Sequence, residues 1–96
     1  MRTSSDQAAQ VAEADVTLPA GVDLHARPAA TFVRAAMRFD AKLRVAAGDR
    51  EADAKSLLSI LALGARRGTS LRLRGEGDDA QAAVAELAAT VSGLAE

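Results

Sequence analysis

Residues 42–64 read KLRVAAGDREADAKSLLSILALG, and this stretch points to the class of fold. Residues 42–45 and 50–54 alternate in character, which predicts the two strands of a hairpin. The turn is expected at Ala47-Gly48, with a longer loop through Asp49 as the alternative. A short apolar helix is predicted next, because a serine precedes the LLSILAL run and a glycine ends it. These two strands and this helix form the middle of the α+β domain that the whole chain predicts.

The charges of the hairpin favour one register. Its expected pairs are Arg44 with Glu51, Lys42 with Asp53 and, on the other side, Leu43 with Ala52. Opposite charges would then share one face of the sheet, and apolar residues the other. This arrangement predicts a sheet with one face in water.

The flanking sequence completes the predicted order βαββαβα. Strands are expected at 15–18 and 69–74, a helix opens at His25-Ala-Arg-Pro28, and Asp78 or Asp79 caps the last helix. The buried stripe of that last helix is expected to be Ala80, Val84, Leu87, Val91 and Leu94. We therefore expect an open-faced two-layer sandwich, with a four-stranded, mainly antiparallel sheet and three helices on one face.

The composition excludes several classes of function. The chain has 96 residues, no cysteine, one histidine and two aromatic residues, and its formal net charge is −1. Thiol nucleophiles and cysteine-ligated zinc are thereby excluded, and neither a metal nor a cofactor is expected. Four basic residues could share the open sheet face and bind nucleic acid, but the near-neutral charge and the lack of aromatic residues disfavour this alternative. They are Lys42, Arg44, Arg72 and Arg74.

The chain is interpreted as one domain with a short extension. Residues 1–14 are small and polar and are expected to form a flexible N-terminal arm, while residues 15–96 form the domain. No apolar run is long enough to cross a membrane, and the N-terminus lacks the apolar middle of a signal peptide. A cytoplasmic monomer without membrane insertion is therefore expected.

The single histidine stands where a helix is predicted to begin. As the N-cap residue, His25 would face the free N–H groups of the first turn, which bind anions. The positive end of the helix dipole favours a neutral, nucleophilic imidazole, and Arg27 can offer its guanidinium to the same anion. These groups together suit the transfer of a phosphoryl group. From position alone, the alternative is a histidine that only caps the helix.

Two motifs resemble those of a known family. The first, Leu24-His25-Ala26-Arg27-Pro28-Ala29, is similar to the phosphorylation-site signature of the HPr family. These are the histidine-containing phosphocarriers of the bacterial phosphoenolpyruvate-dependent sugar phosphotransferase system. The second motif is Ala54-Lys55-Ser56-Leu57-Leu58, at the family's separation of 31 positions from His25 to Ser56. The resemblance covers roughly residues 15–95 and implies the same open-faced fold.

The resemblance also implies a function. His25 would accept a phosphoryl group at Nδ1 from enzyme I, which phosphoenolpyruvate charges, and would pass it to the IIA component of a sugar permease. Arg27 would stabilise the phosphate. The chain would act as a stoichiometric phosphocarrier without independent turnover, not as an enzyme. The alternative is an HPr-like regulator of the nitrogen-related phosphotransferase branch, which acts by binding other proteins according to its phosphorylation state.

Further residues carry over from the second motif. Ser56 matches the family's regulatory serine, which HPr kinase/phosphorylase phosphorylates in many bacteria, and the alternative is that Ser56 simply caps its helix. A phosphate there would place charge beside the apolar helix that is expected to dock on enzyme I. The expected partner-binding residues are Leu24, Leu57, Leu58 and Leu61.

The loop before His25 departs from the family's pattern. Gly21 stands four residues before the histidine, whereas family members commonly place glycine two residues before it. Asp23 therefore brings a negative charge near the expected phosphate. Arg66 and Arg67 are a second departure and are interpreted as part of a solvated loop, with an acidic partner surface as the alternative.

Overall fold

Four strands and three helices make up the fold in the computed structural model, which describes residues 10–95. The strands are β1 (Val11–Thr17), β2 (Lys42–Ala47), β3 (Arg50–Asp53) and β4 (Ser70–Glu76). The helices are α2 (Ala26–Ala36), α3 (Leu57–Leu63) and α4 (Ala80–Ser92). The predicted order βαββαβα is confirmed. No helix among the described residues is long and apolar enough to cross a membrane.

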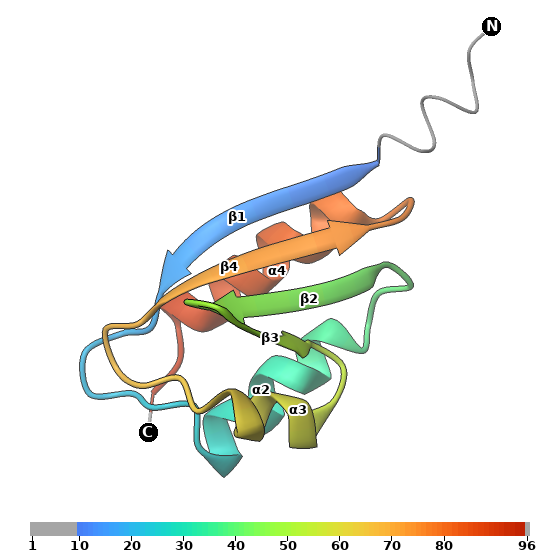
Figure 1. Cartoon of the computed structure of the whole chain (residues 1–96). Coiled ribbons are helices and arrows are strands. Elements are labelled where there is room, and N and C mark those ends of the chain that lie inside the picture. Colours follow the sequence, from blue (N-terminus) through green and yellow to red (C-terminus); the bar gives the residue numbers. More distant parts are fainter. Residues whose placement is uncertain (1–9, 96) are drawn as a thin grey trace, which may run out of the picture.

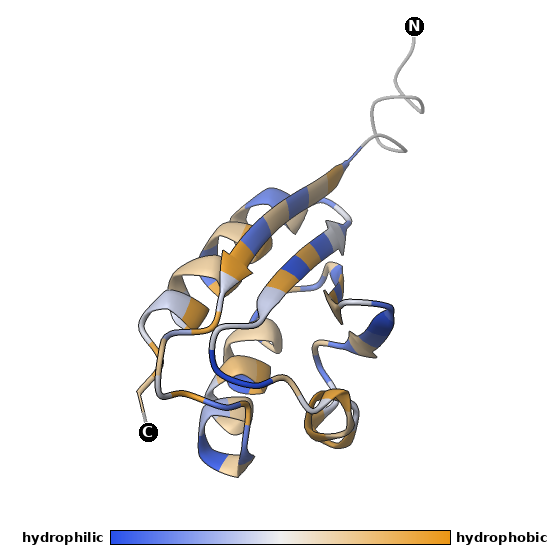
Figure 2. Cartoon of the chain, turned by 60° about the vertical axis from the view of Figure 1, so that its left-hand side comes forward, coloured by the Kyte–Doolittle hydropathy of each residue, from blue (hydrophilic) through white to orange (hydrophobic). Residues whose placement is uncertain are grey.

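The sheet is antiparallel throughout, with the strand order β1-β4-β2-β3 (Figure 1). Side chains alternate along β4, where Leu71 and Leu73 are fully buried and Arg72 and Arg74 are exposed. Figure 2 shows this alternation as orange and blue bands along the strands. The helices cover the apolar face, α4 against the sheet and α2 against α3 and α4. The expected open-faced sandwich is therefore the observed fold.

The opposite face of the sheet carries charges of both signs. Its ion pairs are Arg72–Asp15 at 3.2 Å, Arg74–Glu13 at 2.8 Å, Arg74–Glu76 at 3.1 Å and Arg44–Glu51 at 2.9 Å. The hydrogen bond from Arg74 to Glu13, and to a smaller extent the one to Glu76, raises the pKa of the Arg74 guanidinium above its usual value. Three of the four basic residues considered for nucleic acid, all except Lys42, are thus paired with carboxylates, which offsets most of the positive charge that phosphates would require.

The hairpin register differs from the expected one by two residues. Arg44 lies opposite Asp53 and Val45 opposite Ala52, so the turn is Gly48-Asp49 and not Ala47-Gly48. Gly48 has a φ of +62°, as glycine does at the first position of a type II′ turn. Within residues 10–95, only glycines have a positive φ. A shift of two residues keeps every side chain on its expected face. Arg44 still reaches Glu51, on the diagonal.

The first strand begins earlier than predicted. Val11–Thr17 pairs with β4 from Val11↔Glu76 to Thr17↔Ser70, so residues 11–14, expected in the arm, belong to the sheet. The reason is that these residues already alternate between half-buried alanines and exposed neighbours. Residues 1–9, the rest of the expected arm, lie outside the described part of the chain.

Asp79 joins two parts of the fold instead of capping its own helix. It occupies the N-cap position of α4 but makes no side-chain bond there. Its carboxylate accepts hydrogen bonds from the backbone N–H groups of Asp40 and Ala41, each at 2.8 Å. The start of α4 is thereby tied to the loop between α2 and β2. The expected stripe of α4 is buried as predicted.

Candidate functional site

His25 is the N-cap residue of α2, and its imidazole is exposed. Its backbone is extended, with φ −87° and ψ −172°, its side chain forms no cap hydrogen bond, and 76% of the side chain is exposed. The Ala29 N–H donates to the His25 carbonyl at 2.8 Å, which starts the helix. Pro28 has no N–H group, and within residues 10–95 the N–H groups of Ala26 and Arg27 have no acceptor. Two donors at the positive end of α2 are therefore open to an anion beside the ring.

Arg27 adds a guanidinium to the same helix end. Its side chain is exposed, and no hydrogen bond or ion pair joins it to another residue of the described chain. A planar guanidinium without a carboxylate partner can bind two phosphate oxygens at once. Arg27 and the two free N–H groups thus form a cationic surface beside the only imidazole of the protein.

Two loops hold this helix end in place. The Leu18 N–H donates to the Thr69 carbonyl at 2.9 Å, and the Gly68 N–H donates back to the Leu18 carbonyl at 3.1 Å. Closer to the histidine, the Leu24 N–H donates to the Ala65 carbonyl at 3.0 Å. The loop before α2 and the loop before β4 are thereby joined by their backbones. They hold the backbone at His25 in place although its side chain makes no cap hydrogen bond.

Asp23 provides a further link between the same loops. Its Oδ1 accepts the Arg67 backbone N–H at 2.7 Å, and the Arg67 guanidinium lies 3.4 Å from both carboxylate oxygens. These hydrogen bonds from Arg67, chiefly the backbone one, hold the pKa of the Asp23 carboxyl below its usual range. The carboxylate therefore stays ionised at neutral pH, 3.9 Å from Nε2 of His25.

The second motif begins α3. The hydroxyl of Ser56 accepts the backbone N–H of Ser59 at 3.2 Å, so Ser56 is a true N-cap, and Gly64 ends the helix in the left-handed region at φ 65°. Ile60 and Leu63 face the core, whereas Leu58 is 80% exposed. Leu57 and Leu61 are 40% and 37% exposed. Figure 2 shows α3 as mostly orange although one side of it faces solvent.

The structure brings His25 and α3 together at a shallow depression. This depression has a volume of about 290 Å³ and is lined by Leu24, His25, Leu61, Gly64, Ala65 and Arg66. The histidine motif and the apolar helix thus border the same surface. Leu24 is the exception among the expected partner-binding residues, because it is only 2% exposed and belongs to the core. A docking role for Leu24 does not fit this placement, whereas the other three leucines are accessible.

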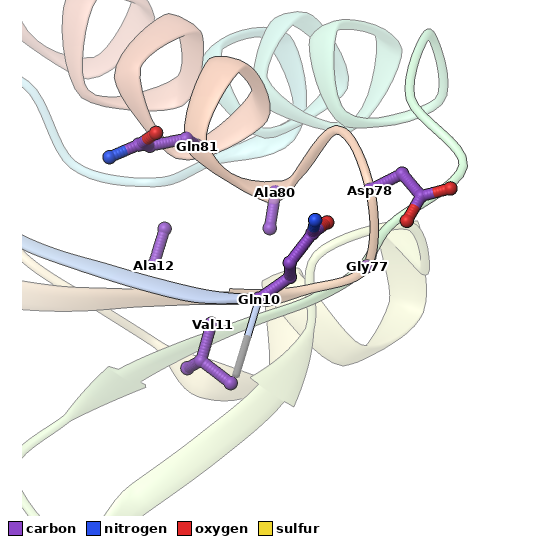
Figure 3. A pocket seen from close by; sticks show the side chains of 7 residues that line it. All are labelled: Gln10, Val11, Ala12, Gly77, Asp78, Ala80 and Gln81. Atoms are coloured by element: carbon purple, nitrogen blue, oxygen red, sulfur yellow. The ribbon is translucent and has the colours of Figure 1, made fainter. Parts of the chain in front are cut away.

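Another pocket lies at the far end of the sheet, away from these residues. It measures about 260 Å³ and is lined by Gln10, Val11, Ala12, Gly77, Asp78, Ala80 and Gln81. Figure 3 shows its wall between the start of β1 and the turn before α4. It contains no imidazole, thiol or hydroxyl nucleophile. Across residues 10–95, no three histidine or carboxylate residues lie close enough together to bind a metal ion.

The contact between Asp23 and Arg67 is the part of the site that sequence reasoning missed. The sequence indicates a lengthened loop with an unusual aspartate, but it does not indicate that Arg67, 44 positions later, pairs with it. The negative charge of Asp23 is indeed near the histidine, but it lies closest to Nε2, whereas the phosphate is expected on Nδ1. Asp23 and Arg67 both depart from the family's pattern and carry opposite charges, and this combination is the signal that could have suggested the pair.

Comparisons with known proteins agree on one family. Residues 12–92 match the family model "PTS HPr component phosphorylation site". The chain is 40% identical over 80 residues to phosphocarrier protein HPr of Haemophilus influenzae, covering 83% of this chain and 94% of that protein. It is 41% identical over 95 residues to the multiphosphoryl transfer protein of Xanthomonas campestris, covering 96% of this chain but only 11% of that longer protein.

A solved structure gives the same assignment. The crystal structure of a phosphocarrier protein HPr from Bacillus anthracis superposes with a TM-score of 0.80 at 34% identity, over 84% of this chain and 96% of that one. Fold, motif and sequence similarity therefore extend over nearly the same residues. This chain belongs to the HPr family of phosphocarrier proteins.

Proposed function

We propose that this protein accepts a phosphoryl group on His25 from phosphoenolpyruvate-charged enzyme I and passes it, in the cytoplasm, to IIA components of sugar permeases. HPr proteins carry phosphoryl groups without a catalytic cycle of their own. In the transfer, the lone pair of Nδ1 forms the bond to phosphorus. The bond between phosphorus and the donor atom breaks, and its electron pair stays with the donor. The resulting phosphoramidate is easily broken again, which suits a relay.

One observation carries the proposal. The exposed ring of His25 lies at the end of α2 where two backbone N–H groups and the Arg27 side chain have no partner within residues 10–95. The ring also borders the apolar surface of α3. The N–H groups and the guanidinium can bind the phosphoryl oxygens while the ring attacks. The exposed leucines can contact a protein donor. A stoichiometric transfer between proteins needs both features and no enclosed substrate pocket.

The direct test is phosphorylation in vitro. The purified chain is incubated with enzyme I and labelled phosphoenolpyruvate, and the labelled residue is located by mass spectrometry under alkaline conditions. We expect one phosphoryl group per chain, on His25, lost on brief treatment with acid and transferable to a sugar-specific IIA protein. An acid-stable label, or no label, would contradict the proposal.

Leu58→Glu is expected to weaken the interaction with enzyme I. Leu58 is 80% exposed on α3, so the substitution should leave the fold intact, but it places a charge in the proposed contact surface. We expect the dissociation constant measured by calorimetry to rise about tenfold or more, as for a central apolar contact.

Met37→Glu is the matched control for this variant. Met37 is 62% exposed at the C-terminal end of α2, the end opposite His25. It therefore introduces the same charge in place of an exposed apolar residue outside the proposed surface. Equal weakening by both variants, or none by Leu58→Glu, would mean that α3 is not the interface.

Two substitutions at Ser56 are expected to separate the effect of its helix cap from the effect of a negative charge at this position. Ser56→Ala removes the hydroxyl that accepts the Ser59 N–H, and it should cost about 0.5–2 kcal/mol of folding stability with unchanged binding to enzyme I. Ser56→Asp keeps a capping oxygen at a favourable helix end and adds charge beside Leu57. It should preserve stability in urea unfolding but weaken binding severalfold, as a phosphate from HPr kinase/phosphorylase would. Wild-type binding by Ser56→Asp would exclude this form of regulation.

A further inference from the structure

Asp23 faces the ring of His25 from a fixed position. Its Oδ2 lies 3.9 Å from Nε2, and its side chain is only 17% exposed, against 76% for the ring. Oδ1 accepts the Arg67 N–H at 2.7 Å, and Oδ2 lies 3.4 Å from the Arg67 guanidinium. Oδ2 is also the oxygen nearer to the imidazole, at a distance where charges attract but no hydrogen bond forms. Family members commonly have a shorter loop here, so the contact depends on the lengthened Gly21–Leu24 segment of this chain.

We propose that Asp23 is a positioning residue for His25: its carboxylate, held by Arg67, keeps the ring proton on Nε2 and thereby leaves Nδ1 unprotonated as the phosphoryl acceptor. The inference deepens the proposed function, since it rests on His25 as the phosphorylated residue. A carboxylate plays the corresponding part in hydrolytic triads, where it selects the tautomer of a histidine and stabilises its positive charge.

The charge balance of the transfer favours this arrangement. Before the reaction the neutral ring carries its proton on Nε2 and its lone pair on Nδ1. When Nδ1 forms the bond to phosphorus, the ring becomes positively charged while the proton remains on Nε2. A carboxylate near Nε2 is attracted more strongly to this product than to the neutral ring. Asp23 therefore stabilises the charge that develops during acceptance.

The same geometry limits repulsion between Asp23 and the phosphate. In the imidazole ring, Cε1 separates Nδ1 from Nε2, and substituents on the two nitrogens point in different directions. Because the carboxylate lies near Nε2, a phosphoryl group on Nδ1 extends away from it. Arg67 also offsets part of the negative charge, through the contacts of its guanidinium with both oxygens at 3.4 Å.

Asp23→Asn tests the inference directly. Asparagine can still accept the Arg67 N–H through its carbonyl oxygen, which preserves the loop. Its amide N–H₂ then replaces Oδ2, loses the contact with the Arg67 guanidinium, and offers the ring a donor in place of a negative charge, which favours a proton on Nδ1 instead. We expect ¹⁵N chemical shifts of the single histidine at alkaline pH to move from the Nε2–H tautomer toward the Nδ1–H tautomer. The rate constant of phosphoryl acceptance should fall about two- to fivefold, which is the factor for unit charges about 4 Å apart in water.

Asp15→Asn is the matched control. It removes another aspartate paired with an arginine, Arg72 at 3.2 Å, but on the open face of the sheet. It should leave both the tautomer and the rate unchanged. Asp23→Glu restores a carboxylate and should recover the Nε2–H tautomer. Spectra of Asp23→Asn identical to wild type, or an equal effect of Asp15→Asn, would overturn the inference. The spectra need no phosphoryl donor, so a wild-type chain that accepts no phosphate would refute the proposed function separately.

Discussion

Replacing His25 by alanine is expected to abolish acceptance of phosphate from enzyme I while the protein stays folded. The ring is the only imidazole in the chain, and without cysteine no thiol can replace it as a nucleophile. Its side chain is 76% exposed and makes no cap hydrogen bond, so the change in folding stability should stay within about 0.5 kcal/mol. The measurement is acid-labile label per chain after incubation with enzyme I and phosphoenolpyruvate, with the fold checked by circular dichroism.

Arg27→Ala is expected to separate the role proposed for Arg27, which binds the phosphate, from that proposed for His25, the nucleophile. Arg27 lies two residues further on, at the same helix end, and its guanidinium forms no ion pair within residues 10–95. Its loss should slow phosphoryl transfer, because one cationic donor is removed, but full labelling should still be reached. Acid-labile phosphate on His25→Ala would refute the assignment of the site. Unchanged kinetics in Arg27→Ala would remove Arg27 from the mechanism.

Local features of the sequence predicted the elements that position this site. Proline in the first turn and apolar residues at helical spacing predict α2, and a serine and a glycine bound α3, where the structure places a hydroxyl cap and a left-handed Gly64. These features act within a few residues, so they do not depend on the rest of the fold. The histidine motif indicated the candidate site because His25 stands at the end of one such element.

Contacts between distant segments could not be predicted in the same way. The register of the hairpin depends on whether Ala47-Gly48 or Gly48-Asp49 forms the turn. The charge pattern does not decide between them, because a shift of two residues leaves every side chain on the same face of the sheet. Leu24, expected to bind a partner, is buried in the core, and its backbone N–H donates to the Ala65 carbonyl of a distant loop. The pair of Asp23 and Arg67 has the same origin. In each case the deciding partner is fixed by packing and not by spacing along the chain.

Phe32→Ala is expected to cause a large loss of stability. Phe32 is fully buried and is the bulkiest of the fully buried side chains, while the other buried residues of α2 are one proline and three alanines. Removing a buried phenylalanine costs about 3–5 kcal/mol, because the transfer free energy is lost and a cavity remains. A domain of this size is stable by about 5–15 kcal/mol, so a large fraction would disappear. Urea unfolding followed by circular dichroism measures the change.

Val33→Ala is the control on the same helix, and the comparison links the core to the site. Val33 is only half-buried, so its truncation should cost about 1 kcal/mol. His25 is the N-cap residue of α2, so unfolding of this helix also disrupts the site. Phe32→Ala should therefore lose phosphoryl acceptance at a lower urea concentration than the wild type, in parallel with its unfolding. The molecules that remain folded should be labelled as in the wild type. A loss of folding stability below about 1 kcal/mol for Phe32→Ala would mean that the buried alanines, and not Phe32, anchor α2 to the core. His25 would then be positioned by the backbone contacts of its loop alone.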